Sequence, residues 1–382
     1  MDIEKRTAAQ EEKKKVELCF IQFSLTLSET QILFLSLQLF FCTINRNSMI
    51  NFSPKRLTTL KNKFDGLKIA VIGDMMLDCY YWGDVKRISP EAPVPVVEIE
   101  NESYRFGGAA NVALNIFKLG GKPYPIGVIG TDTHGKIFTS LVNEAGIISE
   151  GIFKDESRPT TAKTRVIADK QHVVRLDFES KQNINKNLQN KILNYLTEII
   201  QSVDGIILQD YNKGVLTPSL IEKIIESANK NNIIVSVDPK FHNFFLYKNV
   251  TVFKPNRKEA EDILGMKIRK PEDVTFAGNK LLEKLNAKYV LLTLGEEGIA
   301  VFERNKEERR MPTKAREVAD VSGAGDTVIS TITMALAAGA DILEASFLAN
   351  YAGGIVCEEV GILPIEKDKL FDTILRDVDE QH

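Results

Sequence analysis

The chain has 382 residues, of which 43% are hydrophobic and 26% are charged, and its formal net charge is −3. This composition is typical of a globular protein, and the mixed charges exclude a broad nucleic-acid-binding surface. The four cysteines form no CxxC pair and the four histidines have no metal-ligand spacing, which disfavours a disulfide framework and a zinc site. We therefore expect a cytoplasmic protein with no nucleic-acid partner.

The first 48 residues differ from the rest of the chain. Residues 32–44, ILFLSLQLFFCTI, are apolar but shorter than the roughly 20 residues that a membrane span needs. No A-x-A-like cleavage site follows them, which disfavours a signal peptide. We predict no membrane span, an N-terminal extension outside the fold at residues 1–48, and a single domain at residues 49–382. A membrane-surface anchor is the alternative for the extension.

From Lys68 onward, short apolar runs alternate with amphipathic segments. Each run is almost continuously hydrophobic and ends in Gly, Asp, Asn or Pro, which is typical of strands covered on both faces. The order predicts a three-layer α/β/α fold with a mostly parallel central sheet, in which ligands bind at the carboxyl ends of the strands. The expected strands are 68–74, 124–132, 205–211, 233–240, 250–256, 289–295 and 299–304, and the clearest helices are 187–203, 217–231 and 271–287.

Two segments, residues 94–106 and 160–180, alternate apolar and polar residues with no helix between their halves. This pattern is typical of strands with one solvent-exposed face. We predict a small β-lid that stands off the main sheet. Because one-sided strands can pair with a second copy, we also predict a homodimer formed through this lid.

Residues 130–137, GTDTHGKI, nearly match the phosphate-binding loop GxxxxGK[ST]. The match fails at Ile137, which has no hydroxyl to hold Mg²⁺, and Asp132 would put a negative charge inside the phosphate cradle. We interpret this segment as a turn at which Gly135 eases entry to a helix.

A glycine-rich turn precedes an apolar helix in residues 320–330, DVSGAGDTVIS. The first turn of a helix has unpaired N–H groups, and Gly323 and Gly325 let the backbone around Ala324 approach an anion closely. Asp326 would lie beside the same anion. It cannot bind phosphate, but it can accept the proton of an attacking hydroxyl. Catalysis and simple N-capping by this aspartate are both open at this point.

Two further strand ends have the residue types that nucleotide binding requires. Asn256 ends one apolar run and Glu259 follows three residues later, so an amide and a carboxylate can face metal-bound water and phosphate. Thr293 and Gly295 end another run and offer a hydroxyl and an open backbone to a phosphate.

Carboxylates and amides near the first strand are candidates for holding sugar hydroxyls, because they accept and donate in pairs. Asp74 ends the strand and Asp78 follows four residues later, while Gly107 and Gly108 precede a helix that bears Asn111. Helix caps and tight turns are the alternative interpretation of these five residues.

Two segments together resemble the signatures of the ribokinase-like (PfkB-type) sugar kinases: GGAANVALNIFKLGG at residues 107–121 and DVSGAGDTVISTITMALAAG at residues 320–339. The resemblance begins at about Leu67 and continues to the C-terminus. It implies a ribokinase-like fold, ATP and Mg²⁺ as cofactors, and room for a monovalent cation. It also implies Asp326 as the catalytic base beside an anion hole, and Glu259 as a residue that holds Mg²⁺ through water. The candidate nucleotide residues are Asn256, Glu259, Thr293, Gly295 and Asn350, and the residues implied for the sugar are Asp74, Asp78, Gly107, Gly108 and Asn111.

Four shorter segments, RISPEAPVPVVEI, VVRLDFE, DYNKG and VDPK, are similar to the heptose-phosphate kinases that form one half of bifunctional ADP-heptose synthases. This similarity implies phosphorylation of D-glycero-β-D-manno-heptose 7-phosphate at the C1 hydroxyl, in the synthesis of lipopolysaccharide core precursors. A substrate that already bears a phosphate requires cations. The candidates are Arg87, Arg105, Lys163, Arg165, Arg175 and Lys213, of which Arg105, Arg175 and Lys213 are favoured.

Two other functions stay open. The first is a kinase of the same fold that acts on fructose phosphate, ribose or a nucleoside. The second is a sugar-binding regulator without activity, which is disfavoured because the aspartate and both glycines of the turn are present.

Overall fold

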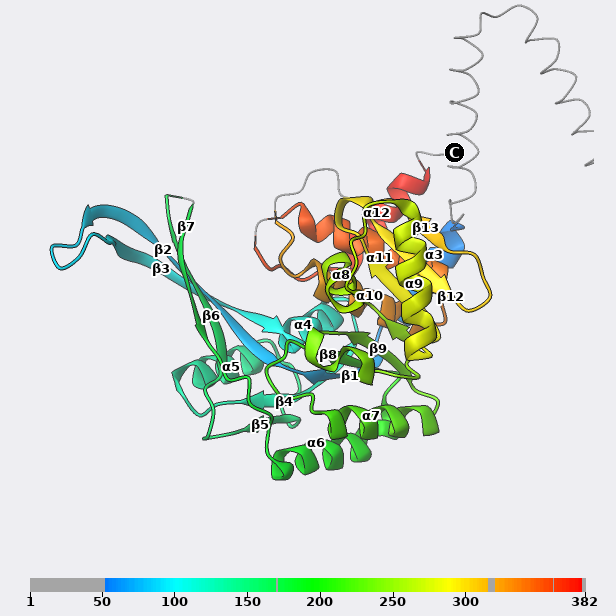
Figure 1. The fold of residues 1–382 in the computed structure, drawn as a ribbon, viewed down its shortest axis with the longest axis horizontal. Coiled ribbons are helices and arrows are strands. Elements are labelled where there is room, and N and C mark those ends of the chain that lie inside the picture. The colour runs from blue at the N-terminus through cyan, green and yellow to red at the C-terminus, as the bar shows by residue number, and fades with distance from the viewer. Residues whose placement is uncertain (1–51, 170, 315–319, 360, 380–382) are drawn as a thin grey trace, which may run out of the picture. The chain divides into compact units, whose positions relative to one another are not determined.

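The computed structural model describes residues 52–169, 171–314, 320–359 and 361–379 (Figure 1). The predicted extension, residues 1–48, lies outside the described residues. In the described part of the chain, no helix has the length and hydropathy needed to cross a membrane.

A nine-stranded sheet lies at the centre of the fold. Its strands are β1 Lys68–Gly73, β4 Lys122–Ile129, β5 Ile152–Lys154, β8 Gly205–Gln209, β9 Ile234–Asp238, β10 Val252–Phe253, β11 Tyr289–Thr293, β12 Ile299–Glu303 and β13 Arg309–Met311. Their order is β13-β12-β11-β10-β9-β8-β1-β4-β5, and all neighbours from β11 to β5 run parallel, whereas β12 and β13 are antiparallel. All seven predicted strands are present, so the predicted fold class is confirmed.

Helices cover both faces of this sheet. Within the described residues they are α3 Pro54–Lys63, α4 Ala109–Lys118, α5 Thr133–Glu144, α6 Lys186–Ile199, α7 Pro218–Lys230, α8 Arg257–Leu264, α9 Pro271–Leu285, α10 Ala324–Ala337, α11 Ile342–Cys357 and α12 Lys367–Asp379. One face packs against α6, α7 and α9, and the other against α4, α10 and α11. Asp132 caps α5 by accepting a hydrogen bond from the Gly135 amide at 2.9 Å, as expected for a turn rather than a phosphate loop.

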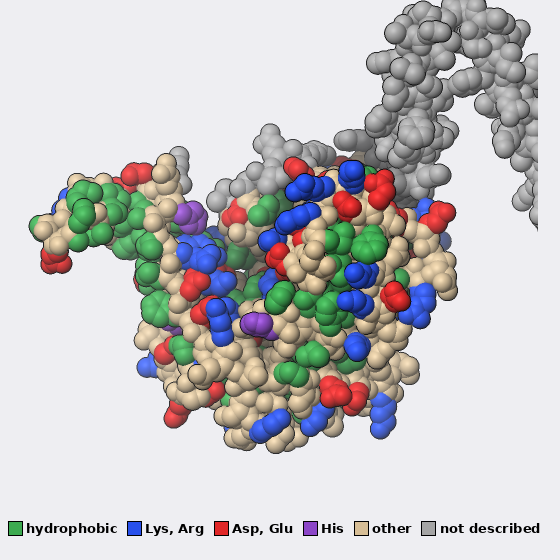
Figure 2. All heavy atoms as spheres, in the orientation of Figure 1, with side chains coloured by type: hydrophobic (Ala, Val, Ile, Leu, Met, Phe, Trp, Pro, Cys, Tyr) green, Lys and Arg blue, Asp and Glu red, His purple; other side chains and the backbone are tan. Residues whose placement is uncertain are grey.

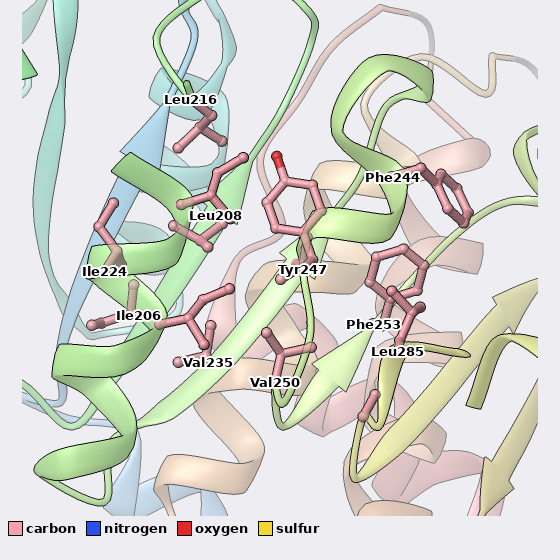
Figure 3. Close-up of a cluster of buried hydrophobic side chains, with 14 of the residues drawn as sticks. Ile206, Leu208, Leu216, Ile224, Val235, Phe244, Tyr247, Val250, Phe253 and Leu285 are labelled. Carbon is pink, nitrogen blue, oxygen red and sulfur yellow. The ribbon is translucent and has the colours of Figure 1, made fainter. Parts of the chain in front are cut away.

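The core explains why the strand sequences are almost continuously apolar. On the α7 face, Ile206 and Leu208 of β8 pack with Ile224 of α7 and with Val235 of β9, and all four side chains are fully buried (Figure 3). Because helices cover the opposite face as well, the residues between them in each strand are also buried.

A second sheet of four strands extends away from the central one (Figure 1). Its strands are β2 Met75–Ile88, β3 Pro95–Gly108, β6 Thr161–Ala168 and β7 Gln171–Phe178, in the order β3-β2-β6-β7. The hairpins β2–β3 and β6–β7 are antiparallel, and β2 pairs with β6 in parallel. We call this sheet the lid; the predicted lid segments lie in β3, β6 and β7.

Strand β2 was not predicted as part of the lid. It follows β1 after Asp74 alone, so one continuous stretch of chain leaves the central sheet and enters the lid. Side chains of a strand alternate between its faces. We call the face that bears Asp78 and Lys163 the inner face, and the face that bears Leu176 and Phe178 the outer face.

Candidate active site

The glycine-rich turn forms the N-terminus of α10. Gly323 is the N-cap residue, with φ 82°, a left-handed conformation that favours glycine, and it supplies no side chain to cap the helix. The amides of the first turn therefore lack a side-chain cap. Asp326 is the third residue of the helix and not its cap, so the N-capping interpretation of Asp326 is wrong.

Asp326 is buried, with 4% of its surface exposed, and three neutral donors from other elements bind its carboxylate. Asn111 Nδ2 donates to Oδ2 at 2.8 Å, while Gln209 Nε2 and the Tyr211 hydroxyl donate to Oδ1 at 2.9 and 3.0 Å. A carboxylate has about four acceptor positions, two on each oxygen. These three bonds leave one position on Oδ2, and the Oδ1 atom of Asn111 is itself buried without a hydrogen-bond partner among the described residues.

Burial raises the pKa of Asp326 to about 7. The hydrogen bond from Asn111 opposes this shift, the charge of Asp238 adds to it, and Tyr211 and Lys254 lower the pKa again. A carboxylate with a pKa near neutrality is a stronger base than an exposed aspartate and is still ionised in part at pH 7.

A buried ion pair lies against the same turn. Lys254 Nζ is 3.1 Å from Asp238 Oδ2, and Gln209 Nε2 also donates to this oxygen at 3.2 Å. A Cβ atom added to Gly325 would lie 3.5 Å from Lys254 Nζ and 3.6 Å from Asp238 Oδ2. Both charges of this ion pair therefore adjoin the start of α10, where the amides of the first turn favour an anion.

Asp74 binds a loop rather than facing open space. Its Oδ2 accepts from the amides of Tyr211 and Lys213 at 2.7 and 3.0 Å, and its Oδ1 accepts from the Val215 amide at 3.2 Å. Burial, together with the charge of Asp210, raises the pKa of Asp74 to about 6 despite these bonds. Asp74 therefore positions the loop that brings Tyr211 to Asp326, and its predicted contact with a sugar stays a prediction.

Asp78 lies on the inner face of the lid. Its Oδ1 is 2.5 Å from Arg165 Nη1, and burial raises the pKa of Asp78 against the opposing charge of Arg165. A Cβ atom added to Gly107 would lie 2.2 Å from Asp78 Oδ2, so only glycine leaves room for this carboxylate. Gly108 is the N-cap residue of α4, which carries Asn111 to Asp326.

The predicted nucleotide residues lie at neighbouring strand ends, with one exception. Asn256 caps α8, and its side chain and that of Glu259 each accept a backbone N–H of the other at 2.9 Å. Asn256 also forms a bridge with Thr293, two residues before Gly295. Asn350, by contrast, lies on α11 and donates to the Pro312 carbonyl at 2.7 Å.

Glu259 fits the metal role in part. One oxygen accepts the Asn256 amide, the other forms an ion pair with Lys240, and each retains an acceptor position. Amide and carboxylate oxygens are ligands that Mg²⁺ takes, often through water. In the described part of the chain, no cluster of three or more His, Cys, Asp or Glu residues is arranged to hold a metal directly.

Four residues of the site, Gln209, Tyr211, Asp238 and Lys254, were not assigned a role from the sequence. A signal for them exists, because each is polar and lies in or just after an apolar run, where the carboxyl ends of buried strands meet. The sequence does not show which strand ends are neighbours in the sheet.

The fold and this site, at the carboxyl ends of parallel strands, define the class of sugar kinases. The model of the pfkB family carbohydrate kinases matches residues 67–368. The chain belongs to this family of carbohydrate kinases, so the predicted resemblance is confirmed.

Two curated proteins that are similar to this chain have the same name. "Bifunctional protein HldE" of Geobacter sulfurreducens is 43% identical over 307 residues, which cover 80% of this chain and 63% of the relative. The protein of the same name from Helicobacter pylori strain J99 is 43% identical over 294 residues, covering 77% of this chain and 63% of the relative. The chain thus spans less than two thirds of the length of these relatives.

Two solved structures have the same fold. Arabidopsis thaliana ribokinase complexed with ribose and ATP has a TM-score of 0.64 at 21% identity, over 80% of this chain and 98% of that chain. Escherichia coli phosphofructokinase-2 in complex with fructose-6-phosphate has a TM-score of 0.65 at 19% identity, over 82% and 100% of the two chains.

Proposed function

We propose that this protein transfers the γ-phosphoryl group of ATP to the C1 hydroxyl of D-glycero-β-D-manno-heptose 7-phosphate, giving the 1,7-bisphosphate. The identity to HldE proteins over most of the chain supports this substrate. The observation that carries the reaction is the buried carboxylate of Asp326, with one vacant acceptor position, at the uncapped N-terminus of α10.

In this mechanism the vacant position on Asp326 Oδ2 accepts the proton of the C1 hydroxyl as the hydroxyl attacks the γ-phosphorus in line. The unpartnered Oδ1 of Asn111 orients the sugar beside it. The amides of Gly325 and Asp326 stabilise the charge that develops on the phosphoryl group, and the Ala324 amide joins them when it leaves the Val321 carbonyl, to which it donates at 3.3 Å. Asn256 and Glu259 are the residues that would hold Mg²⁺, which would neutralise charge on the phosphates.

The low exposure of Asp326 supports a reaction that excludes water. Water that reached the base would hydrolyse ATP, and a lid that closes over the sugar prevents this. Because ATP and the precursors of lipopolysaccharide are cytoplasmic, the proposal also locates the reaction in the cytoplasm. The kinase domain of this proposal is residues 49–382, with residues 1–48 as an extension.

The proposal includes a homodimer formed through the outer face of the lid. Three alternate residues of β7, Val174, Leu176 and Phe178, are 45%, 45% and 48% exposed on this face. Figure 2 shows hydrophobic side chains gathered on the extended part of the lid. A second copy of the same sheet would bury this apolar surface, as symmetric dimers do.

The decisive experiment is product analysis. Purified protein is incubated with ATP, Mg²⁺ and heptose 7-phosphate, and phosphorus NMR and mass spectrometry identify a new anomeric phosphate. Fructose 6-phosphate, ribose and nucleosides are tested in parallel. A preference for one of these sugars would contradict the heptose assignment. Binding of a sugar with no release of ADP from ATP, for every sugar tested, would indicate a regulator.

A further inference from the structure

The inner face of the lid has an excess of positive charge. Residues that are register partners across the four strands share this face and form two rows. The first row is Arg105, Asp78, Lys163 and Asp177, and the second is Ser103, Tyr80, Arg165 and Arg175. Four cations against two carboxylates favour an anionic ligand beneath the lid.

Two of these four cations have a carboxylate partner, and a third, Arg105, donates from Nη1 to the Ile362 carbonyl at 3.1 Å. Arg165 pairs with Asp78 at 2.5 Å, and Arg175 pairs with Asp177 at 2.9 Å. Lys163 is half-buried, and among the described residues no carboxylate lies within salt-bridge distance of its ammonium group. Burial lowers the pKa of Lys163, because its lost hydration is not replaced by a close ion pair.

Lys163 is also the lid cation that approaches the base. Its Nζ lies 5.9 Å from the centre of the Tyr211 ring, and the hydroxyl of the same tyrosine donates to Asp326 at 3.0 Å. A second lysine, Lys240, lies 5.4 Å from this ring but is paired with Glu259. One tyrosine ring thus separates the unpaired ammonium group from the carboxylate that would activate the acceptor hydroxyl.

We propose that Lys163 binds the phosphate group that the acceptor sugar already bears, so that the inner face of the lid selects a phosphorylated sugar. The proposal rests on the proposed function in one respect, because it takes the hydroxyl at Asp326 as the acceptor. It moves Lys163 ahead of the favoured candidates Arg105, Arg175 and Lys213, because Arg175 and Lys213 are paired with Asp177 and Glu179 and Arg105 donates to the Ile362 carbonyl.

The test compares Lys163→Met with the wild-type enzyme on heptose 7-phosphate and on the same heptose without phosphate. Loss of one charge-assisted contact predicts a KM for the phosphorylated sugar that is about 10- to 100-fold higher, with kcat and the KM for free heptose little changed. Lys163→Arg should restore most of the affinity. The matched control is Lys86→Met, also on the lid, where Lys86 is exposed and pairs with Glu98 at 3.2 Å; it should change neither KM.

A merely structural role for Lys163 predicts a different result. If the ammonium group only covers the Tyr211 ring, Lys163→Met raises the KM of both sugars equally or changes kcat alone. Either result overturns the proposal. An unchanged KM for heptose 7-phosphate does so as well.

A binding assay keeps this test separate from the identity of the sugar. Trp82 is the only tryptophan of the chain and stacks on Tyr80 of the inner face, with ring centres 6.2 Å apart. Its fluorescence is titrated with inorganic phosphate in wild-type and Lys163→Met protein. A higher phosphate concentration at the midpoint in the variant supports the site, whether or not the enzyme turns over heptose 7-phosphate. Identical titrations of the two proteins overturn the site in either case.

Discussion

Replacing Tyr211 with phenylalanine should move the acidic limb of the pH–rate profile to higher pH. The Tyr211 hydroxyl donates to Asp326 Oδ1 at 3.0 Å, and burial raises the pKa of Tyr211 well above its ordinary value, so the hydroxyl stays a donor. This bond stabilises the ionised carboxylate and lowers the pKa of Asp326. Phenylalanine keeps the ring and removes only the donor.

The size of the shift follows from the bond that is lost. A hydrogen bond to a charged group contributes about 1.5–3 kcal/mol, and one pKa unit corresponds to about 1.4 kcal/mol. The pKa of Asp326, about 7 in the wild-type protein, should therefore rise by about one unit or more. Only the ionised carboxylate accepts a proton, so at pH 7 kcat/KM falls about fivefold for a one-unit shift, while the two enzymes converge above about pH 9.

The assay is kcat/KM measured by ADP release between about pH 5.5 and 9.5, the range that brackets both pKa values. Tyr195→Phe, on α6 and distant from the base, is the control and should leave the limb in place. An acidic limb that does not move in folded Tyr211→Phe protein would show that Asp326 is not the group that titrates.

The remaining predictions concern the base, its ion pair and the lid. Asp326→Asn should lower kcat by about 10²–10⁴-fold with ATP binding kept. The raised pKa of Asp326 means that ionising this buried carboxyl group lowers the stability of the wild-type protein as pH rises from about 4 through 7. The Asp326→Asn variant should therefore be more stable than wild type at pH 8, by about 1–3 kcal/mol, but not at pH 4. Equal melting temperatures at pH 8 would contradict this. Lys254→Met leaves Asp238 buried and unpaired and should cost about 3–5 kcal/mol in urea unfolding, against at most about 1 kcal/mol for the exposed control Lys258→Met. Leu176→Glu should convert a dimer to monomers in sedimentation equilibrium, and an unchanged mass would exclude the outer face of the lid as the interface.

The central sheet could be predicted from the sequence because burial on both faces gives its strands long apolar runs. Strands β5 and β13 show no such run, because none of the three residues of β5 and only one of the three of β13 is buried. Strand β2 carries Asp78, Tyr80 and Trp82 on its inner face, and register shifts interrupt its pairing with β3 after Trp82. Its alternation of large residues on both faces resembles neither a buried strand nor a strand with one wet face.

Asp326 and Asn111, which the structure joins by a hydrogen bond, could be singled out from the sequence because both lie in local motifs at the start of helices. Gln209 and Tyr211 could not, because their roles depend on the neighbours of β8. The register joins Gln209 on β8 to Asp238 on β9, and Asp74, after β1, holds the loop that carries Tyr211. These contacts depend on the strand order β9-β8-β1, and a single sequence does not reveal that order.

The ion pair between Lys254 and Asp238 is consistent with the proposed role of Asp326 as a base. If the ammonium group faced Asp326 directly, the close positive charge would hold the pKa of Asp326 low, and the carboxylate would be a weak proton acceptor. Instead Asp238 binds Lys254 at 3.1 Å, and the three groups within hydrogen-bond distance of Asp326 are all neutral. The cation remains close to the start of α10, where a phosphoryl group needs it, while burial keeps the carboxylate basic. In the proposed mechanism, keeping the Lys254 ammonium group away from the Asp326 carboxylate leaves a cation near the phosphoryl group and a basic carboxylate beside it.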